Sequence, residues 1–278
     1  MRFTQTILRG IGQVLFQNNS YSGFLFLIGI FYNSWLLGLA ALIGTIISTI
    51  TAQVLKYEKA AIKNGLYGFN GTLTGIAVFL FFEVTIATVL ALIVGAILST
   101  VLMNFLKKII PQFTAPFVLA TWFVIYVLLL IFNFQLAISS EPIVNTFHFF
   151  TAFSNSFGQV MFQENVITGL FFLLAILVNS KLMAVYAIYA AVLGSLTGWL
   201  LLASSSPINS GLMGYNAILC AIALTGKKWT DFLWITIAII LSTLLNIGLE
   251  MTGIITLTAP FILATWIVLI LKKRLQNS

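Results

Sequence analysis

Three blocks of the sequence occur twice, in the same order. The pairs are "GQVLFQNN" and "GQVMFQEN" (from Gly12 and Gly158), "GLYGFNGTLTG" and "GLMGYNAILCA" (from Gly65 and Gly211), and "TAPFVLATW" and "TAPFILATW" (from Thr114 and Thr258). The first two pairs are 146 residues apart and the third is 144 residues apart. Chance similarity between apolar segments does not keep such a register, so the chain is predicted to consist of two homologous halves.

The halves are predicted to cover residues 1–134 and 147–278, joined by a polar, proline-containing linker over residues 135–146. Of all residues, 60% are apolar and only 7% are charged, whereas about a quarter of a soluble domain is charged. The apolar runs are continuous and lack the period-two alternation of membrane β-barrel strands. The sequence therefore predicts an all-α polytopic membrane protein.

Each half is predicted to contain about five transmembrane helices. The apolar runs lie near residues 22–32, 34–55, 66–82, 84–106 and 113–133, and near 168–178, 182–203, 212–226, 231–249 and 255–271. The segment with the "GQV" string precedes these runs and is too short and too polar to cross. We expect it to form a re-entrant half-helix, which is stable only when it packs in protein or lines a cavity.

An odd number of crossings predicts that the second half enters the membrane from the opposite side, so that the halves are inverted repeats. With the N-terminus in the cytoplasm, all 13 basic residues fall in inside connections or tails, as the positive-inside rule requires. The outside connections carry Glu83, Glu141 and Glu250 instead. We expect a multi-pass protein of a bacterial inner membrane with both termini cytoplasmic.

Inverted repeats bring equivalent segments together at the bilayer midplane, where transporters of this kind bind their substrates. The equivalent side chains are amide, aromatic, aliphatic and hydroxyl groups: Gln13 and Gln159, Phe16 and Phe162, Phe69 and Tyr215, Leu73 and Leu219, and Thr114 and Thr258. None of these side chains is charged, whereas an ion pathway needs rings of charged side chains or carbonyls, so the solute is expected to be neutral. A small, neutral, planar amide fits, because side-chain oxygens can replace its lost water and ring faces can sandwich it.

Three smaller expectations concern the same blocks. Pro116 and Pro260 are expected to free carbonyl groups near the threonines, because proline removes a donor and disturbs the preceding turn. Asn70 and Asn216 are expected to satisfy backbone groups at a helix distortion. The hydroxyl of Tyr215 needs a hydrogen-bond partner.

Other functional classes find little support in the sequence. It has no metal-ligand cluster, nucleophile constellation or phosphate loop, so neither an enzyme nor a cofactor is expected, and the net charge of +7 does not indicate nucleic acid. Cys220 cannot form an intramolecular disulfide, since it is the only cysteine. Glu164 has two open interpretations, a residue at the mouth of the pathway or a gate and proton relay. His148 is expected at the outer end of the second half.

The strings "RGIGQVLFQNN", "GLYGFNGTLTG" and "TAPF", each repeated in the second half, resemble the signature blocks of the urea transporter family. The resemblance extends over essentially the whole chain. It implies passive, channel-like transport of urea through a central pore between the repeats, in a homotrimer with one pore per subunit. In that family, aromatic slots and neighbouring oxygens remove water from urea at a selectivity filter.

The resemblance also implies a role for each candidate residue. Gln13 and Gln159 match polar residues of the filter, although some members have glutamate at the second position. One slot would consist of Phe16, Phe69 and Leu73, and the other of Val160, Tyr215 and Leu219, with Phe162 as the counterpart of Phe16 and with Thr114 and Thr258 at the midpoint. Two alternatives remain open: a channel for ammonia, water or a short amide, and a membrane protein that transports nothing.

Overall fold

The computed structural model describes residues 3–137, 146–201 and 203–277. In these residues it contains α-helices, two short 3₁₀ helices and connecting turns, with no strand, which confirms the all-α class. The chain divides into two compact units, residues 1–141 and 142–278. Arg2, Glu141 and most of the predicted linker (138–145) lie outside the described residues.

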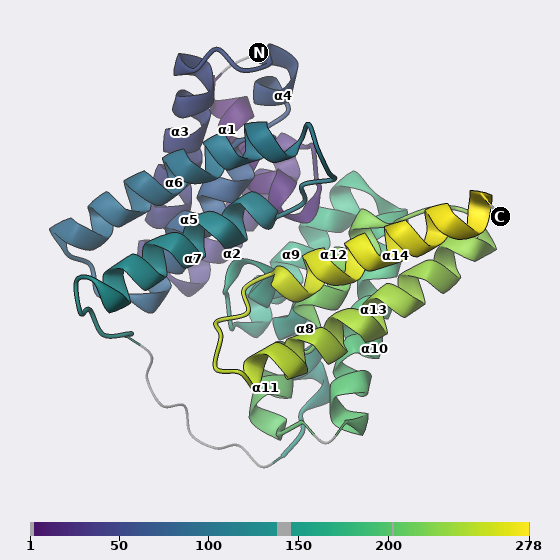
Figure 1. Cartoon of the computed structure of the whole chain (residues 1–278). Helices are drawn as coiled ribbons and strands as arrows, with labels where there is room; N and C mark the ends of the chain where they lie inside the picture. Colours follow the sequence, from purple (N-terminus) through teal and green to yellow (C-terminus); the bar gives the residue numbers. More distant parts are fainter. Residues whose placement is uncertain (1–2, 138–145, 202, 278) are drawn as a thin grey trace. The chain divides into compact units, whose positions relative to one another are not determined.

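The two units have the same succession of elements (Figure 1). Unit 1 contains α1 (Phe3–Gly12), η1 (Gln13–Leu15), α2 (Ser20–Asn33), α3 (Trp35–Val54), α4 (Lys59–Lys63), α5 (Gly68–Phe81), α6 (Ile86–Leu106) and α7 (Ala115–Leu130). Unit 2 contains α8 (Phe149–Gly158), η2 (Gln159–Met161), α9 (Val166–Asn179), α10 (Lys181–Leu200), α11 (Ser205–Asn209), α12 (Tyr215–Ala223), α13 (Trp229–Glu250) and α14 (Ala259–Asn277).

Each of the predicted apolar runs overlaps a helix. By length and composition, α3, α6, α10 and α13 can each cross a membrane alone, whereas α5 and α7 are shorter apolar helices. The pair formed by α8–η2 and α9 is bent by 71° at its break, as in a broken span or a re-entrant loop. The fold is therefore that of a multi-pass helical membrane protein.

The repeated "GQV" string forms the break between the first two helices of each unit. Phe16 and Phe162 both have a φ of 60°, in the left-handed region that costs a non-glycine residue free energy. The next residues of the string hold this turn, because Gln17 Nε2 donates to the Leu15 carbonyl and Gln163 Nε2 to the Met161 carbonyl, at 2.5 and 2.7 Å. These donations satisfy carbonyls at the end of a helix.

Asn19 and Asn165 start the next helix on the far side of this break. Asn19 Oδ1 accepts a hydrogen bond from Tyr21 N at 2.8 Å, and Asn165 Oδ1 accepts one from Thr168 N at 3.0 Å. Asparagine is a preferred N-cap because its oxygen satisfies such backbone donors. The repeated string thus encodes a turn and a helix start.

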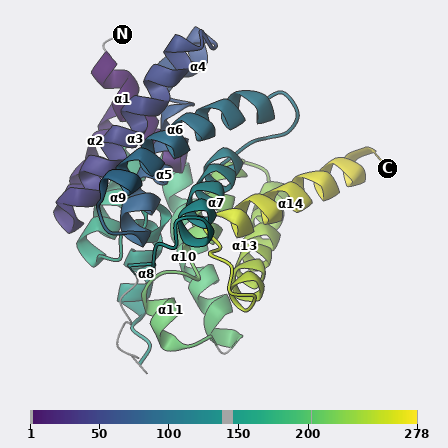
Figure 2. The same ribbon diagram turned by 60° about the vertical axis from the view of Figure 1, so that its left-hand side comes forward.

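The short helices α5 and α12 form the core of their units. In α5 every residue from Gly68 to Phe79 is buried, and in α12 every residue from Tyr215 to Ile222. Helix α5 packs against α1, α3, α6 and α7, as Figures 1 and 2 show, and α12 packs against α8, α10, α13 and α14. At 14 residues, α5 is about 21 Å long, shorter than the roughly 30 Å hydrocarbon core.

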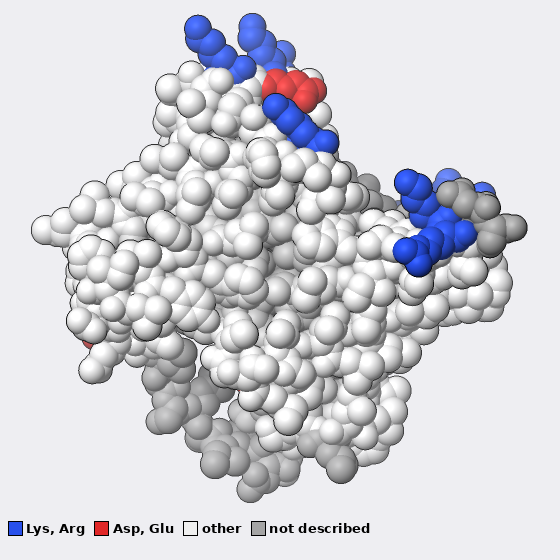
Figure 3. Space-filling view, in the orientation of Figure 1, with Lys and Arg blue, Asp and Glu red and all other residues white. Residues whose placement is uncertain are grey.

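Charged side chains lie at the ends of the long helices. In unit 1, Lys56 follows α3 and Lys107–Lys108 follow α6, near the lysines of α4, and this basic end is visible in Figure 3. Glu83 lies at the other end of α6. Unit 2 has Lys181 at the start of α10 and Lys227–Lys228 before α13, with the basic residues of the α14 tail (Figure 3).

Candidate functional site

In unit 1 the predicted site residues come from three elements that pack together. Element η1 packs against α5, and α5 packs against α7. Gln13 and Phe16 are half-buried at η1, and Phe69 and Leu73 are buried on α5. Thr114, also buried, immediately precedes α7.

The Phe16 ring makes an observed contact with the start of α7. It meets the ring of Phe113 in an edge-on arrangement, with ring centroids 6.3 Å apart. Phe113 directly precedes Thr114 and has a φ of 42°. The left-handed break at Phe16 therefore places an aromatic side chain beside the threonine block.

Unit 2 brings its own candidates together in the same way. Element η2 packs against α12, and α12 packs against α14. Val160, Tyr215, Leu219 and Thr258 are buried, whereas Gln159 and Phe162 are half-buried. Each unit thus contains one polar and aromatic cluster at the meeting point of a broken helix, a short buried helix and the start of the last helix.

The amide group of Gln13 is held by Asn64, a residue outside the repeated blocks. Gln13 Nε2 donates to the backbone carbonyl of Asn64 at 2.9 Å, and Arg9 Nη1 lies 3.5 Å from Asn64 Oδ1. The Gln13 nitrogen is therefore engaged within unit 1, and its oxygen takes no part in this contact. Asn64 lies 51 residues from Gln13 in the sequence, and no sequence pattern indicates a contact between them.

Asn70 and Asn216 satisfy backbone donors, as predicted. Asn70 Oδ1 accepts a hydrogen bond from Phe117 N at 3.1 Å, and Asn216 Oδ1 accepts one from Phe261 N at 3.3 Å. Each bond joins the short buried helix of its unit to the first turn of the last helix.

The prolines do not free the carbonyl groups of the two threonines themselves. Pro116 lies in the first turn of α7, where a backbone N–H has no partner within the helix and none is lost. The Thr114 carbonyl accepts from Val118 N at 3.0 Å, and the Thr258 carbonyl from Ile262 N at 3.2 Å. The threonine carbonyls therefore belong to ordinary helical hydrogen bonds.

The Tyr215 hydroxyl has a hydrogen-bond partner, as predicted. It donates to the Leu257 carbonyl, and Asn246 Oδ1 lies 3.4 Å away. Asn246 also accepts from Asn216 Nδ2 at 3.3 Å and donates to Glu250 Oε1 at 2.8 Å. Its position within the apolar run 231–249 could have identified it, since a polar residue inside a membrane segment usually has a function or a partner.

Glu164, whose interpretation was left open, and His148 both lie in exposed positions. Glu164 is exposed in the break between η2 and α9, and its Oε1 accepts a hydrogen bond from Ser210 Oγ at 2.6 Å. Asn165, and not Glu164, caps α9. His148 precedes α8, and its backbone N–H donates to Asn209 Oδ1 at 2.8 Å.

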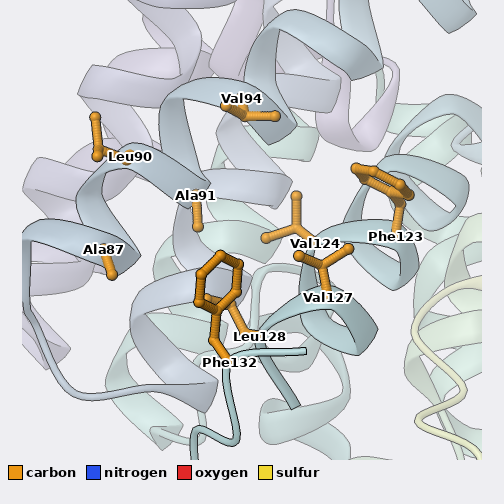
Figure 4. Close-up of a pocket in the computed structure, with 9 residues that line it drawn as sticks. All are labelled: Ala87, Leu90, Ala91, Val94, Phe123, Val124, Val127, Leu128 and Phe132. Atoms are coloured by element: carbon orange, nitrogen blue, oxygen red, sulfur yellow. The ribbon is translucent and has the colours of Figure 1, made fainter. Parts of the chain in front are cut away.

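A separate cavity of about 320 Å³ lies between α6 and α7 in unit 1 (Figure 4). Its lining is apolar and includes Leu90, Phe123 and Phe132, whose side chains are largely exposed. It offers no hydrogen-bonding side chain to a polar solute, and none of the predicted site residues lines it. In a membrane, lipid chains would face this groove.

The repeated units, the apolar helices of membrane-spanning length and the uncharged polar clusters define a multi-pass helical membrane protein of the transporter or channel class. The model of the urea transporter family matches residues 4–273, which include both units. The chain therefore belongs to the urea transporter family, a family of transporters and not of enzymes.

Related proteins agree with this assignment. Urea transporter 1 of Rattus norvegicus is 33% identical over 247 residues, which cover 81% of this chain and 64% of that protein. Urea transporter 1 of Capra hircus is 29% identical over 306 residues, which cover 100% of this chain and 79% of that protein. The chain thus spans just under two thirds of the rat relative's length.

Proposed function

We propose that this protein conducts urea passively across a membrane, through a pathway lined by the equivalent clusters of its two units. The observation that carries the proposal is the family match across both units, within which each unit assembles the same amide, aromatic and hydroxyl groups. The relatives are named as urea transporters.

The chemistry of the clusters supports a neutral amide as the solute. Removing water from an amide without new hydrogen bonds costs several kcal/mol. The oxygen of Gln13 and the hydroxyls of Thr114 and Thr258 can replace part of that hydration. The flat faces of Phe16, Phe69 and Tyr215 and their counterparts can sandwich a planar molecule without binding an ion strongly.

We propose that Gln13, Phe16, Phe69, Leu73 and Thr114 form one half of a selectivity filter. The other half consists of Gln159, Val160, Phe162, Tyr215, Leu219 and Thr258. The units are inverted repeats, with their basic ends and both termini in the cytoplasm of a bacterial inner membrane, and the protein is a homotrimer, as the family resemblance implies.

Flux through proteoliposomes of defined composition tests this function. The purified protein should give saturable urea flux without an ion gradient, and slower flux of ammonia, water and larger amides. Urea flux no faster than that of empty liposomes would exclude the proposal. Faster permeation of ammonia or water than of urea would favour the alternative solutes.

Two substitutions and a matched control test the filter. Gln13→Ala and Thr258→Val should each reduce urea flux while the protein stays folded. Thr265→Val makes the same chemical change two turns further along α14, where the hydroxyl contacts Cys220 Sγ at 3.6 Å, and should leave flux unchanged. Equal flux in Thr258→Val and Thr265→Val would remove Thr258 from the filter.

A further inference from the structure

We propose that Asn70 and Asn216 are positioning residues for the urea pathway. Each accepts a hydrogen bond from the first turn of the last helix of its unit, a bond that the threonine at the start of that helix, Thr114 or Thr258, could otherwise accept. This inference rests on the proposed function, since it concerns how that pathway presents its hydroxyl groups.

The backbone donors at the start of α7 require such a cap. The first N–H groups of a helix have no partner within it. Ala115 N donates to the Gln112 carbonyl at 2.9 Å, and Pro116 has no N–H. The remaining donor, Phe117 N, is the one that an N-cap threonine usually accepts with its side chain.

Thr114 is the N-cap residue of α7, yet its side chain makes no capping hydrogen bond. The hydrogen bond from Phe117 N is accepted instead by Asn70 Oδ1, at 3.1 Å, and Asn70 lies on a different helix. The cap therefore comes from the buried helix α5, and the orientation of the Thr114 hydroxyl is not fixed by capping its own helix.

The same arrangement recurs in unit 2. Ala259 N donates to the Thr256 carbonyl at 3.0 Å, Pro260 has no N–H, and Phe261 N donates to Asn216 Oδ1 at 3.3 Å. Because the pattern occurs in both units with the proline and the asparagine in equivalent places, we infer that it serves the threonine positions that the two units share.

The burial of the asparagines supports a specific role for their oxygen. Asn70 is fully buried, and its Nδ2 has no hydrogen-bond partner. A buried amide nitrogen without a partner is unfavourable, so the favourable contact of the Asn70 amide is the hydrogen bond that its oxygen accepts from Phe117 N. In unit 2 the equivalent nitrogen, Asn216 Nδ2, donates to Asn246 Oδ1 at 3.3 Å. The Asn216 oxygen still accepts from the first turn of the last helix, as the Asn70 oxygen does.

Removing the Asn70 amide should turn the Thr114 hydroxyl toward its own helix. In Asn70→Ala the Thr114 hydroxyl, at the N-cap position of α7, is the side-chain oxygen best placed in the sequence to accept from Phe117 N. Capping its own helix would turn that hydroxyl away from the solute.

The test compares urea flux in proteoliposomes for three single variants. Asn70→Ala should reduce flux about tenfold, as expected for one lost hydrogen bond to the solute. Asn70→Asp keeps an accepting oxygen at the helix N-terminus, where a carboxylate is favourable, but it also buries a carboxyl group, so it should retain clearly more flux than Asn70→Ala. Loss of flux in Asn70→Asp as large as in Asn70→Ala would overturn the inference.

Thr121→Val is the matched control for packing between the same two helices. It removes the next hydrogen bond between α5 and α7, from Thr121 Oγ1 to Thr74 Oγ1 at 3.3 Å, without touching the cap. Flux in Thr121→Val should stay close to wild type. A loss equal to that of Asn70→Ala would show that the asparagine acts only through packing, and would overturn its positioning role.

A double variant separates positioning from general destabilisation. If Asn70 acts through Thr114, then Asn70→Ala should cost less than about twofold in flux once Thr114→Val has removed the hydroxyl, because coupled residues are not additive. The same loss in both backgrounds, or no loss in either, would contradict the inference.

Amide hydrogen exchange supplies a readout that needs no solute. The Phe117 amide should exchange faster in the Asn70→Ala/Thr114→Val double variant, which removes both acceptors, and at the wild-type rate in Thr121→Val. Unchanged exchange in the double variant would overturn the cap itself. Absent urea flux in the wild-type protein would instead overturn the proposed function, and the exchange data would distinguish the two failures.

Discussion

Phe69 and Tyr215 occupy equivalent positions in the two units, and one hydroxyl group is the difference between them. That hydroxyl is buried and donates to the Leu257 carbonyl. The position that corresponds to Leu257 in unit 1 is Phe113, which contacts the ring of Phe16. The two clusters therefore share their rings but differ in how the backbone before each threonine is held.

Replacing Tyr215 with phenylalanine should separate the ring from the hydroxyl. Tyr215→Phe should lower the free energy of unfolding by about 0.5–1.5 kcal/mol, the usual net loss for one hydrogen bond, while urea flux persists because the ring remains. Denaturant unfolding in detergent and proteoliposome flux measure the two effects. Tyr126→Phe, at a 37% exposed tyrosine of α7, is the control and should change neither. Loss of flux in Tyr215→Phe would assign the hydroxyl itself to the pathway.

Lys107, at the basic end of unit 1, contacts a carboxylate and a hydroxyl group. Its Nζ lies 3.3 Å from Glu58 Oε2 and donates to the Tyr67 hydroxyl at 2.9 Å. Burial alone would lower the pKa of Lys107, but Tyr67 and Glu58 together raise it above its usual value of 10.5. A raised pKa in the folded state means that the charged lysine stabilises the fold.

This stabilisation should be fully present below pH 10.5 and should be lost as the pH rises through the folded-state pKa. Lys107→Met should therefore lower the free energy of unfolding at neutral pH by no more than about 1 kcal/mol, since the carboxylate partner is exposed. The difference from wild type should shrink above pH 10.5. Lys108→Met, at an exposed neighbour, is the control. A difference that grows with rising pH would contradict this sign.

At the scale of the elements, α3 and α5 touch through their backbones. A Cβ atom at Gly44 would overlap the carbonyl oxygen of Gly71, and one at Gly71 would overlap that of Gly44. Small residues allow such close approach of helices in membranes. Because α5 carries Phe69, Leu73 and the capping Asn70, this contact determines where half of the candidate site lies.

Gly44→Ala should therefore destabilise the protein by about 1–3 kcal/mol, as expected when a methyl group is forced into a packed interior. A Cβ atom at Gly248 in α13 would have no neighbouring atom within 4 Å, so Gly248→Ala should stabilise by about 0.5–1 kcal/mol through backbone entropy. Thermal unfolding in detergent compares them. If Gly44→Ala is as well tolerated as Gly248→Ala, the close approach of α3 and α5 is not required.

The apolar runs predicted the helices well because burial in lipid and burial in protein both select apolar residues. They predicted helix ends less well at the short buried helices. The run at 212–226 contains α12, which covers only Tyr215–Ala223, because the preceding turn, with Gly211 at a φ of 83°, is also buried and apolar. Hydropathy does not distinguish a buried turn from a buried helix.

The site residues were identified by repetition, but their partners were not. Asn64 and Asn246 lie in other elements from the side chains that they hold, and long-range contacts leave no local pattern. The engagement of the two threonine carbonyls was not predictable for a related reason. It depends on where α7 and α14 begin, and the residues just before these helices, Phe113 and Leu257, are left-handed, although their types do not signal that conformation.

At the scale of the whole molecule, the charges relate the two units to the membrane. Basic residues follow the C-terminal ends of α3 and α6 in unit 1, but they lie at the N-terminal ends of α10 and α13 in unit 2. These helices correspond in the order of elements. If all basic ends face the cytoplasm, corresponding helices cross the bilayer in opposite directions, as inverted repeats require.

Cysteine labelling can test this orientation unit by unit. Cys220 is buried and can be replaced by alanine to give a background without thiols. Single cysteines at Lys108 and Lys227 should react with a membrane-impermeant maleimide only after the membrane is permeabilised, because both positions belong to basic ends. Cysteines at Glu83 and Thr252, at the opposite helix ends, should react from outside in intact cells.

The pair of basic positions decides between the two possible arrangements. Lys108 follows α6 and Lys227 precedes α13, the corresponding helix of unit 2. Repeats that run in the same direction would place these two positions on opposite sides of the bilayer, whereas inverted repeats place them on the same side. Labelling of one position from outside and of the other only after permeabilisation would exclude inversion. It would also remove the reason for expecting equivalent residues of both units to line one pathway.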